Sequence, residues 1–372
     1  MLFIKYILTI VSNMVFIFSI STAQEVPPQE LPIIHQMVRD VSADRIENDI
    51  RKLVSFGTRH TLSDTKSQTQ GIGAARRWIF SEFEKVSASC GGCLDVMYVS
   101  DIVTGNRIPE PTEVVSVIAI QRGEHDPNRY VSMSGDIDSR ISDPLNGNDK
   151  SPGANDNASG MAGVIEAARI LSKYKFAGSI IYMGLSGEEQ GLYGGRIVAA
   201  HALKNKWRIK AVLNNDMIGN ITGINGVVNN TSARVFSEGT RYVETEDEAR
   251  QRRFSGGEVD SPSRNIARFI DRQADKYVPN LDVMMIYRLD RFGRGGHHRP
   301  FNAVGIPAVR IMETNELYDR QHQDIRVENG REYGDVIEGV NFDYTKKLTA
   351  LNISVLAEMA AAPPFPSNGT LK

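Results

Sequence analysis

The chain has 372 residues, of which 41% are apolar, and this is enough to close the core of one large or two ordinary domains. Its formal net charge of −2 gives no basic excess of the kind that phosphate contacts need. The composition therefore indicates a folded globular protein and excludes nucleic acid from the expected partners.

The first 23 residues are typical of an export signal. Lys5 precedes an apolar stretch from Ile7 to Ile20, and Ser21-Thr22-Ala23 supplies the small residues of a cleavage site. A retained membrane anchor is the alternative, but polar residues interrupt a stretch that is short for a span of ~20 residues. We therefore expect a secreted or periplasmic protein that has no membrane contact once the signal is removed.

Two helices are predicted before residue 90, after a proline-rich, extended lead-in over residues 24–34. Apolar residues recur at helical spacing after Ser42, and a second amphipathic helix is expected over residues 73–86. Cys90 and Cys93 then flank two glycines, which in an exported protein favours a local disulfide over a redox motif or a metal knuckle. Two cysteines cannot complete a zinc site, so any metal must be held by His, Asp and Glu.

From residue 113 onward, short apolar runs alternate with helical stretches, which is typical of a sheet covered by helices on both faces. Strands are expected over residues 114–120, 130–134, 179–183, 211–215 and 308–311. Helices are expected over residues 159–172, 191–202 and 344–361. The segment from Phe236 to Pro279 is more charged than its surroundings, and we interpret it as a solvated loop and helix inserted into the domain; a lid over the substrate is the alternative.

Acidic side chains follow three of the predicted strands. Asp136 and Asp138 come after the second strand, Glu188 and Glu189 after the third, and Asp216 directly after the fourth. Ligands of open α/β sheets gather outside the carboxyl ends of the strands. These three strands therefore deliver acids to one edge of the sheet.

A fourth acidic position lies in the polar, glycine-rich turn from Gly153 to Gly160, which leads into an apolar helix. Its Asp156 could simply cap that helix. Together with the other acids it would bring up to six negative charges to one edge, and these cannot all stay ionised without compensation. Two divalent cations about 3.5–4 Å apart would supply that compensation. Carboxylates and imidazoles are accepted ligands of zinc and manganese.

The adjacent pair Glu188-Glu189 can divide the work of hydrolysis, because neighbouring side chains point in different directions. One could bind metal while the other faces the attacking water. Stabilisation of a helix N-terminus is the alternative for both. Three late histidines, His297, His298 and His322, are candidate ligands between which chemistry alone does not choose.

As a set, these segments resemble the co-catalytic di-zinc aminopeptidases of metallopeptidase family twenty-eight, which are related to glutamate carboxypeptidase and glutaminyl cyclase. The matching segments lie in family order over residues 113–325: Ser134 to Ser139, Gly153 to Gly160, Gly187 to Leu192, Asn215 to Gly219 and Phe301 to Pro307. The resemblance implies a three-layer α/β/α fold with a mixed, mostly parallel central sheet. It also implies one peptidase domain over residues 24–372, with the charged insertion at about 236–279.

The resemblance further implies roles for single residues. Asp156 would bridge two metal ions, Glu188 would be the general base, and Asp138 would orient the ligand on its strand. Metal ligation would fall to Asp136, Glu189, Asp216 and, because a nearby Asp follows it, His322. His298 and Tyr318 would contact the substrate or support the ligands.

One departure from the family pattern is the replacement of the usual His-x-Asp by Asp136-Ile137-Asp138. One metal would then have only carboxylate ligands, from Asp136, Asp156 and Asp216, and such a site favours manganese or magnesium over zinc. We therefore expect zinc to be held firmly at the site that contains His322 and a weaker ion at the other. A second departure is His297, where relatives often have Asp.

The expected function is metal-assisted hydrolysis of peptides by a secreted exopeptidase. An aminopeptidase is the first hypothesis, because an acid-rich site can hold the ammonium of a free N-terminus. Four arginines cluster late in the chain, and one could bind a substrate carboxylate, as a carboxypeptidase or dipeptidase requires: Arg291, Arg294, Arg299 and Arg310. An inactive binding module with the same fold is the rival hypothesis.

Overall fold

A computed structural model describes residues 30–257 and 260–363 of the chain. The predicted signal, residues 1–23, lies outside the described residues. None of the helices in the described part of the chain is long and apolar enough to cross a bilayer.

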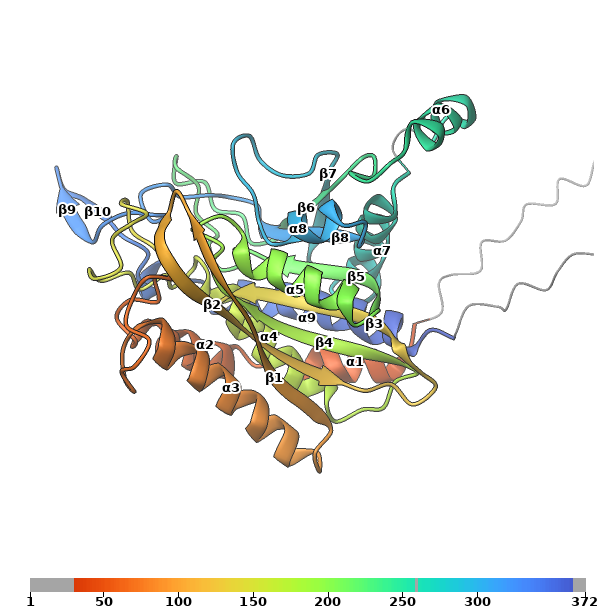
Figure 1. The fold of residues 1–372 in the computed structure, drawn as a ribbon, viewed down its shortest axis with the longest axis horizontal. Coiled ribbons are helices and arrows are strands. Elements are labelled where there is room, and N and C mark those ends of the chain that lie inside the picture. The colour runs from red at the N-terminus through yellow and green to blue at the C-terminus, as the bar shows by residue number, and fades with distance from the viewer. Residues whose placement is uncertain (1–29, 258–259, 364–372) are drawn as a thin grey trace, which may run out of the picture.

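An eight-stranded sheet forms the centre of the molecule (Figure 1), in the order β1-β2-β4-β3-β5-β8-β6-β7. Neighbouring strands run parallel in the pairs β3–β4, β3–β5, β5–β8 and β6–β7, and antiparallel in the other three pairs. The strands are β1 Leu94–Gly105, β2 Ile108–Gln121, β3 Asp126–Asp136, β4 Gly178–Leu185, β5 Arg208–Asn215, β6 Ser232–Ser237, β7 Asp282–Ile286 and β8 Ala308–Glu313. A separate hairpin joins β9 Arg326–Glu328 to β10 Arg331–Tyr333.

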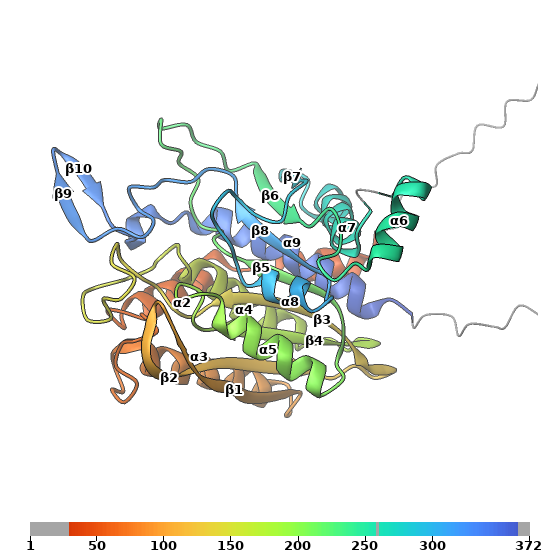
Figure 2. The same ribbon diagram turned by 45° about the horizontal axis from the view of Figure 1, so that its top comes forward.

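Helices cover both faces of the sheet, which is seen most clearly when the molecule is turned (Figure 2). One face carries α3, α4, α7 and α9, with α1 and α2 packed outside them, and the other face carries α5 and α8. Apolar side chains fill the layer on each side of the sheet. The helices are α1 Pro32–Arg39, α2 Ala43–Val54, α3 Gly71–Ser89, α4 Ala158–Leu171, α5 Tyr193–Lys204, α6 Glu246–Ser255, α7 Pro262–Tyr277, α8 His298–Ala303 and α9 Phe342–Ala361; a short 3-10 turn, η1, spans Ile337–Gly339.

The predicted three-layer α/β/α architecture with a mixed, mostly parallel sheet is confirmed. Each of the five predicted strands lies within an observed strand, and the expected helices are present to within a few residues. The side chain of Ser42 caps α2 by accepting from the N–H of Arg45. The lead-in differs from the prediction, because α1 begins at Pro32, which is well suited to the first turn of a helix. The predicted disulfide joins Cys90 and Cys93.

The charged segment near residues 236–279 divides into two parts. Helix α6 has no buried residue and stands away from the body of the molecule (Figure 1), as a solvated insertion would. Helix α7, in contrast, buries one face against α9 and the strands β6 and β7.

Strands β4, β3, β5 and β8 are adjacent and parallel, so their carboxyl ends meet at one edge of the sheet. The turn after β3 reaches the same edge through close packing at the start of α4. A Cβ on Gly160 would lie 2.2 Å from the carbonyl oxygen of Asn215, so only glycine lets α4 approach β5 this closely. The turn that carries Asp156 is thereby held beside the ends of β3 and β5.

Candidate metal centre and active site

Asp156, Glu189 and His322 form a compact group of potential ligands at this edge. One ligand atom of each residue lies within 4.8 Å of the others. His322 Nε2 is 3.0 Å from an oxygen of Asp156 and 2.9 Å from an oxygen of Glu189. The three residues come from the turn before α4, the loop after β4 and the connection after β8.

Asp156 is fixed from both its backbone and its side chain. Asp335 accepts hydrogen bonds from the N–H groups of Asn155 and Asp156, at 2.8 and 2.7 Å. Gln321 donates to the Asp156 carboxylate at 3.1 Å. Buried side chains with few rotamer choices hold a ligand in place before the metal arrives.

Glu188 and Glu189 are positioned by Asp138, whose carboxylate accepts from both of their backbone N–H groups, at 3.2 and 3.1 Å. Thr61 also donates to Asp138, at 3.2 Å. The structure therefore places Asp138 under the loop that carries the two glutamates. Arg140, from the loop after β3, completes this region through an ion pair with Glu189 at 2.8 Å.

The donor set of the Asp156, Glu189 and His322 group fits zinc. Carboxylate oxygens and imidazole nitrogens are both ligands of zinc, and a catalytic zinc site has three protein ligands and keeps a further position open. Donor atoms bonded to one tetrahedral zinc at ~2.0 Å lie about 3.3 Å apart, so gaps of 2.9 and 3.0 Å need little adjustment. These three residues can hold a metal ion with small side-chain movements.

Arg140 is the neighbour that would have to adapt to such an ion. Its Nη2 lies 2.7 Å from His322 Nδ1, and because arginine has only donors, Nδ1 accepts and Nε2 carries the proton. A ligating histidine normally has the opposite arrangement, with Nδ1 donating to a carboxylate, a carbonyl or water. Metal binding at Nε2 therefore requires Arg140 to release the ring.

In the other half of the predicted metal centre, groups of the protein itself compensate the negative charge of the carboxylates. Arg310, which is almost wholly buried on β8, pairs with Asp216 at 3.0 Å and with Asp290 at 3.0 Å. Burial alone would lower the pKa of Arg310, but Asp216 and Asp290 more than offset this and raise it above its ordinary value. A permanent positive charge thus neutralises Asp216.

The carboxylate of Asp136 is also occupied by contacts with neighbouring side chains. His297 Nδ1 lies 2.5 Å from one oxygen of Asp136, and Asn157 donates to the other oxygen at 2.7 Å. Burial raises the pKa of Asp136 to about 8 and lowers that of His297 to about 4. The buried pair is therefore neutral, with one shared proton, near neutral pH.

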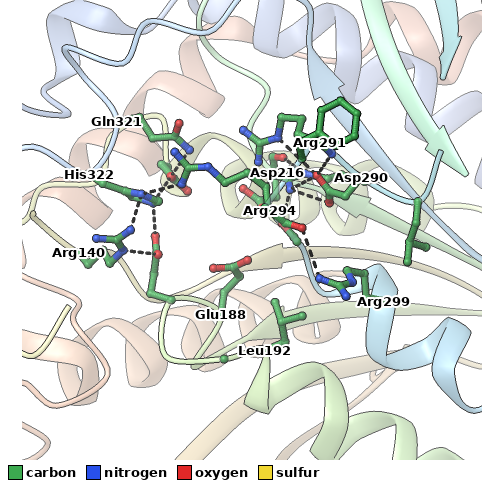
Figure 3. A pocket seen from close by; sticks show the side chains of 18 of the residues that line it. Arg140, Glu188, Leu192, Asp216, Asp290, Arg291, Arg294, Arg299, Gln321 and His322 are labelled. Atoms are coloured by element: carbon green, nitrogen blue, oxygen red, sulfur yellow. Dashed lines mark hydrogen bonds and ion pairs between the residues drawn. The ribbon is translucent and has the colours of Figure 1, made fainter. Parts of the chain in front are cut away.

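Glu188 points into a cavity of about 790 Å³ that is also lined by Asp156, Glu189, Asp216 and His322 (Figure 3). It forms no ion pair with any residue in the ranges 30–257 and 260–363. Burial and then the carboxylate of Glu189 raise the pKa of Glu188 well above its ordinary value. The side chain is thus an unengaged carboxyl group with an increased proton affinity.

The remaining predicted residues lie further away. His298 is buried, and its Nε2 contacts the carbonyl oxygen of Leu289 at 2.7 Å and lies 3.6 Å from Asp290, so it supports the loop that carries Asp290. Tyr318 is half exposed and is not among the residues that line the described cavity.

Sequence reasoning missed three residues that organise the site. Arg310 was noted only as part of an arginine cluster, although its position in a buried strand was a signal, because a buried arginine needs acidic partners. Asp335 and Arg140 lie in irregular segments and carry no pattern that could have identified them.

Comparisons with known proteins agree with this geometry. The sequence model of Peptidase family M28 matches residues 116–340. A "Probable zinc metalloprotease" of Pyrenophora teres f. teres is 44% identical over 350 residues, which cover 93% of this chain and 72% of the relative. The chain belongs to peptidase family M28.

Solved structures with the same fold include an aminopeptidase and a glutaminyl cyclase. The Legionella pneumophila LapA aminopeptidase superimposes with a TM-score of 0.63 at 18% identity, covering 91% of this chain and 78% of LapA. The Macrostomum lignano glutaminyl cyclase gives a TM-score of 0.63 at 15% identity, covering 91% of this chain and 96% of the cyclase. At such identities the likeness shows the fold alone.

Proposed function

We propose that the protein is a secreted, zinc-dependent exopeptidase in which Glu188 is the general base. The observation that carries the proposal is the position of Glu188, which has no ion-pair partner in the described chain and lines the same cavity as Asp156, Glu189 and His322. The similarity to the probable zinc metalloprotease of Pyrenophora teres f. teres supports zinc and proteolysis. The predicted signal peptide supports secretion.

A zinc ion held by Asp156, Glu189 and His322 would polarise the scissile carbonyl and acidify water at the site. Glu188 accepts the proton of the attacking water and later returns it to the leaving amine. Burial raises the pKa of Glu188, and the resulting increase in proton affinity favours its taking a proton from water. Asp138 holds the Glu188 backbone and so aims the carboxyl group.

We also propose that the two metal positions differ in strength. A second ion at Asp136, Asp156 and Asp216 would compete with Arg310 for Asp216, and with His297 and Asn157 for Asp136. At the first position, Arg140 forms an ion pair with Glu189, and Arg294 contacts only the ring nitrogen of His322 that faces away from the other two ligands. This supports a firmly held zinc beside His322 and a weakly held, exchangeable second ion, for which manganese suits the oxygen ligands.

The cavity favours short substrates or the ends of chains. Its volume of about 790 Å³ falls within the range of small-ligand sites, ~300–1,000 Å³, and is small for a long extended peptide. An aminopeptidase remains the first hypothesis for the chain end that is recognised. A carboxylate-recognising exopeptidase is the second, and the arginines in the cavity favour it.

Replacement of Glu188 tests the assignment. Glu188→Gln keeps the shape of the side chain but cannot accept a proton, so turnover of short peptides should fall ~10²–10⁴-fold while bound zinc stays at the wild-type amount. Glu84→Gln, at an exposed position on α3, is the matched control and should change neither. Full activity of Glu188→Gln would reject Glu188 as the base.

A further inference from the structure

The cavity has an unusual charge composition for a chain with a net charge of −2. Eight arginines and five carboxylates line it. Arg140, Arg291 and Arg310 form ion pairs with acidic residues. The other five, which we call the arginine wall, form no ion pair with any residue that the structure describes: Arg107, Arg196, Arg288, Arg294 and Arg299.

The loop that joins β7 to α8 supplies Arg288 and Arg294, and the first turn of α8 supplies Arg299; Arg294 and Arg299 are labelled in Figure 3. Arg294 Nη1 lies 3.3 Å from His322 Nδ1, which places its guanidinium beside the metal-ligand group. Arg299 donates to the carbonyl oxygen of Arg294 at 3.3 Å. Arg288 stacks on Phe292 with its Cζ 3.9 Å from the ring centroid, and its buried Nε has no hydrogen-bond partner in the described structure.

The other two members come from separate parts of the fold. Arg107, in the turn between β1 and β2, donates to the carbonyl oxygen of Glu189 at 2.7 Å. Arg196, on α5, lies over the ring of Tyr193 at 5.5 Å. In the described residues no acidic side chain positions any of the five guanidinium groups, and each keeps N–H donors that can bind an anion.

The carboxylates of the cavity offer much less to a cation. Asp156 already accepts a hydrogen bond from His322, and Glu189, Asp216 and Asp290 form ion pairs with arginine. Glu188 is the remaining acid, and it is the proposed base. An ammonium group would meet one free carboxylate against five free guanidinium groups.

We propose that the arginine wall binds a carboxylate of the substrate close to the scissile bond. This inference rests on the proposed peptidase function and names its substrate class: short peptides that carry either a free C-terminal carboxylate or an acidic side chain beside the cleaved bond. Guanidinium groups bind carboxylates in a bidentate, charge-assisted manner. The partly enclosed cavity strengthens the attraction by focusing the field of the wall.

Matched peptides test the inference and distinguish the two sources of the carboxylate. The rates of cleavage are compared for a neutral, amidated tetrapeptide, for its free acid, and for amidated forms with Glu in place of a Gln at the first or last position. At least one carboxylate form should have a kcat/KM about 10-fold or more above that of the neutral amide. The preferred form identifies the source. An equal or better rate for the neutral amide would overturn the inference and leave the proposed function standing.

Variants show whether the wall causes the preference. Arg288→Gln should reduce the ratio of kcat/KM between the carboxylate and amide peptides several-fold, and Arg288→Lys should restore part of it. Arg250→Gln, at an exposed position on α6 where it pairs with Asp247, is the control and should leave the ratio unchanged. A ratio that survives in Arg288→Gln combined with Arg299→Gln would overturn the role of the wall.

A binding measurement separates this inference from the proposed function. Glutarate should bind the wild-type protein more tightly than glutaramide in calorimetry, and the difference should shrink in Arg288→Gln combined with Arg299→Gln and at high salt. If no peptide is cleaved and glutarate still shows this difference, the proposed function fails and the anion site stands. Equal binding of the two compounds overturns the anion site.

Discussion

Both halves of the site are built from carboxylates, but different groups compensate the negative charge in each half. Around His322, Asp156 and Glu189 face an imidazole and leave room for an ion. Around Arg310, Asp216 and Asp136 are neutralised by a guanidinium group and by a proton shared with His297. Buried acids at the ends of strands therefore need compensation for their charge, and either a metal ion or groups of the chain itself can supply it.

The largest expected effect comes from breaking the half that binds metal. His322→Ala removes the one imidazole of the ligand group, so tight zinc binding should be lost and turnover should fall at least ~10³-fold, because the proposed chemistry depends on that ion. Zinc content and peptide cleavage measure both effects. His125→Ala, at an exposed position before β3, is the control. Retention of one tight zinc in His322→Ala would show that the ion is held elsewhere.

Breaking the half that contains Arg310 should lower the free energy of unfolding. Arg310→Met leaves Asp216 and Asp290 buried without their cation, which typically costs about 3–5 kcal/mol. Denaturant unfolding measures the change in the free energy of unfolding. Arg299→Met, which breaks no ion pair, should cost far less. A difference below about 1 kcal/mol between the two variants would mean that Asp216 and Asp290 do not depend on Arg310.

Zinc titration of chelator-treated protein compares the halves directly. We expect one tight step and a second step at least ~100-fold weaker, because the second ion must displace groups that already neutralise Asp136 and Asp216. Manganese should compete at the weak step more readily than at the tight one. Two equally tight zinc steps would contradict the proposed asymmetry.

A smaller effect is expected from Arg140, the competitor of the ion in the metal-binding half. In Arg140→Gln, Glu189 is released from its ion pair, and the new amide oxygen can accept a hydrogen bond from the Nδ1–H of His322. Zinc affinity should therefore rise by roughly 10-fold, the scale on which groups that support metal ligands act. Calorimetry measures this change. Arg122→Gln is the control, because Arg122 lies just after the end of β2 and its ion pair is with Asp95 on β1.

The sequence predicted those parts of the fold whose residues are buried on both faces. β4 is buried along its whole length and was predicted from its apolar run. β1 has exposed residues along much of its length, so its sequence has no such run and the strand was missed. β6 and β7 flank the charged segment and were also missed, because β6 pairs with β7 and β8 through contacts far apart in the chain.

The candidate site, like the fold, was predicted only in part from the sequence. Asp156, Glu189 and His322 come together as expected, because the order of parallel strands determines which loops meet. The pairing of Arg310 with Asp216 and Asp290 was not predictable, because Asp290 lies in an irregular loop without periodicity. Arg310 was noted only as one of four late arginines, one of which could bind a substrate carboxylate, whereas the structure buries it against two aspartates.

The connection between β8 and α9 contacts Asp156 from two separate parts of its length. His322 reaches its carboxylate, and Asp335 accepts from its backbone N–H. The hairpin β9–β10 lies between these two contacts in the chain. A single proteolytic nick in that hairpin would thus leave each fragment end tethered to the same aspartate, so the cut protein should keep its catalytic geometry. The hairpin is accordingly a natural place to insert a tag or a reporter domain.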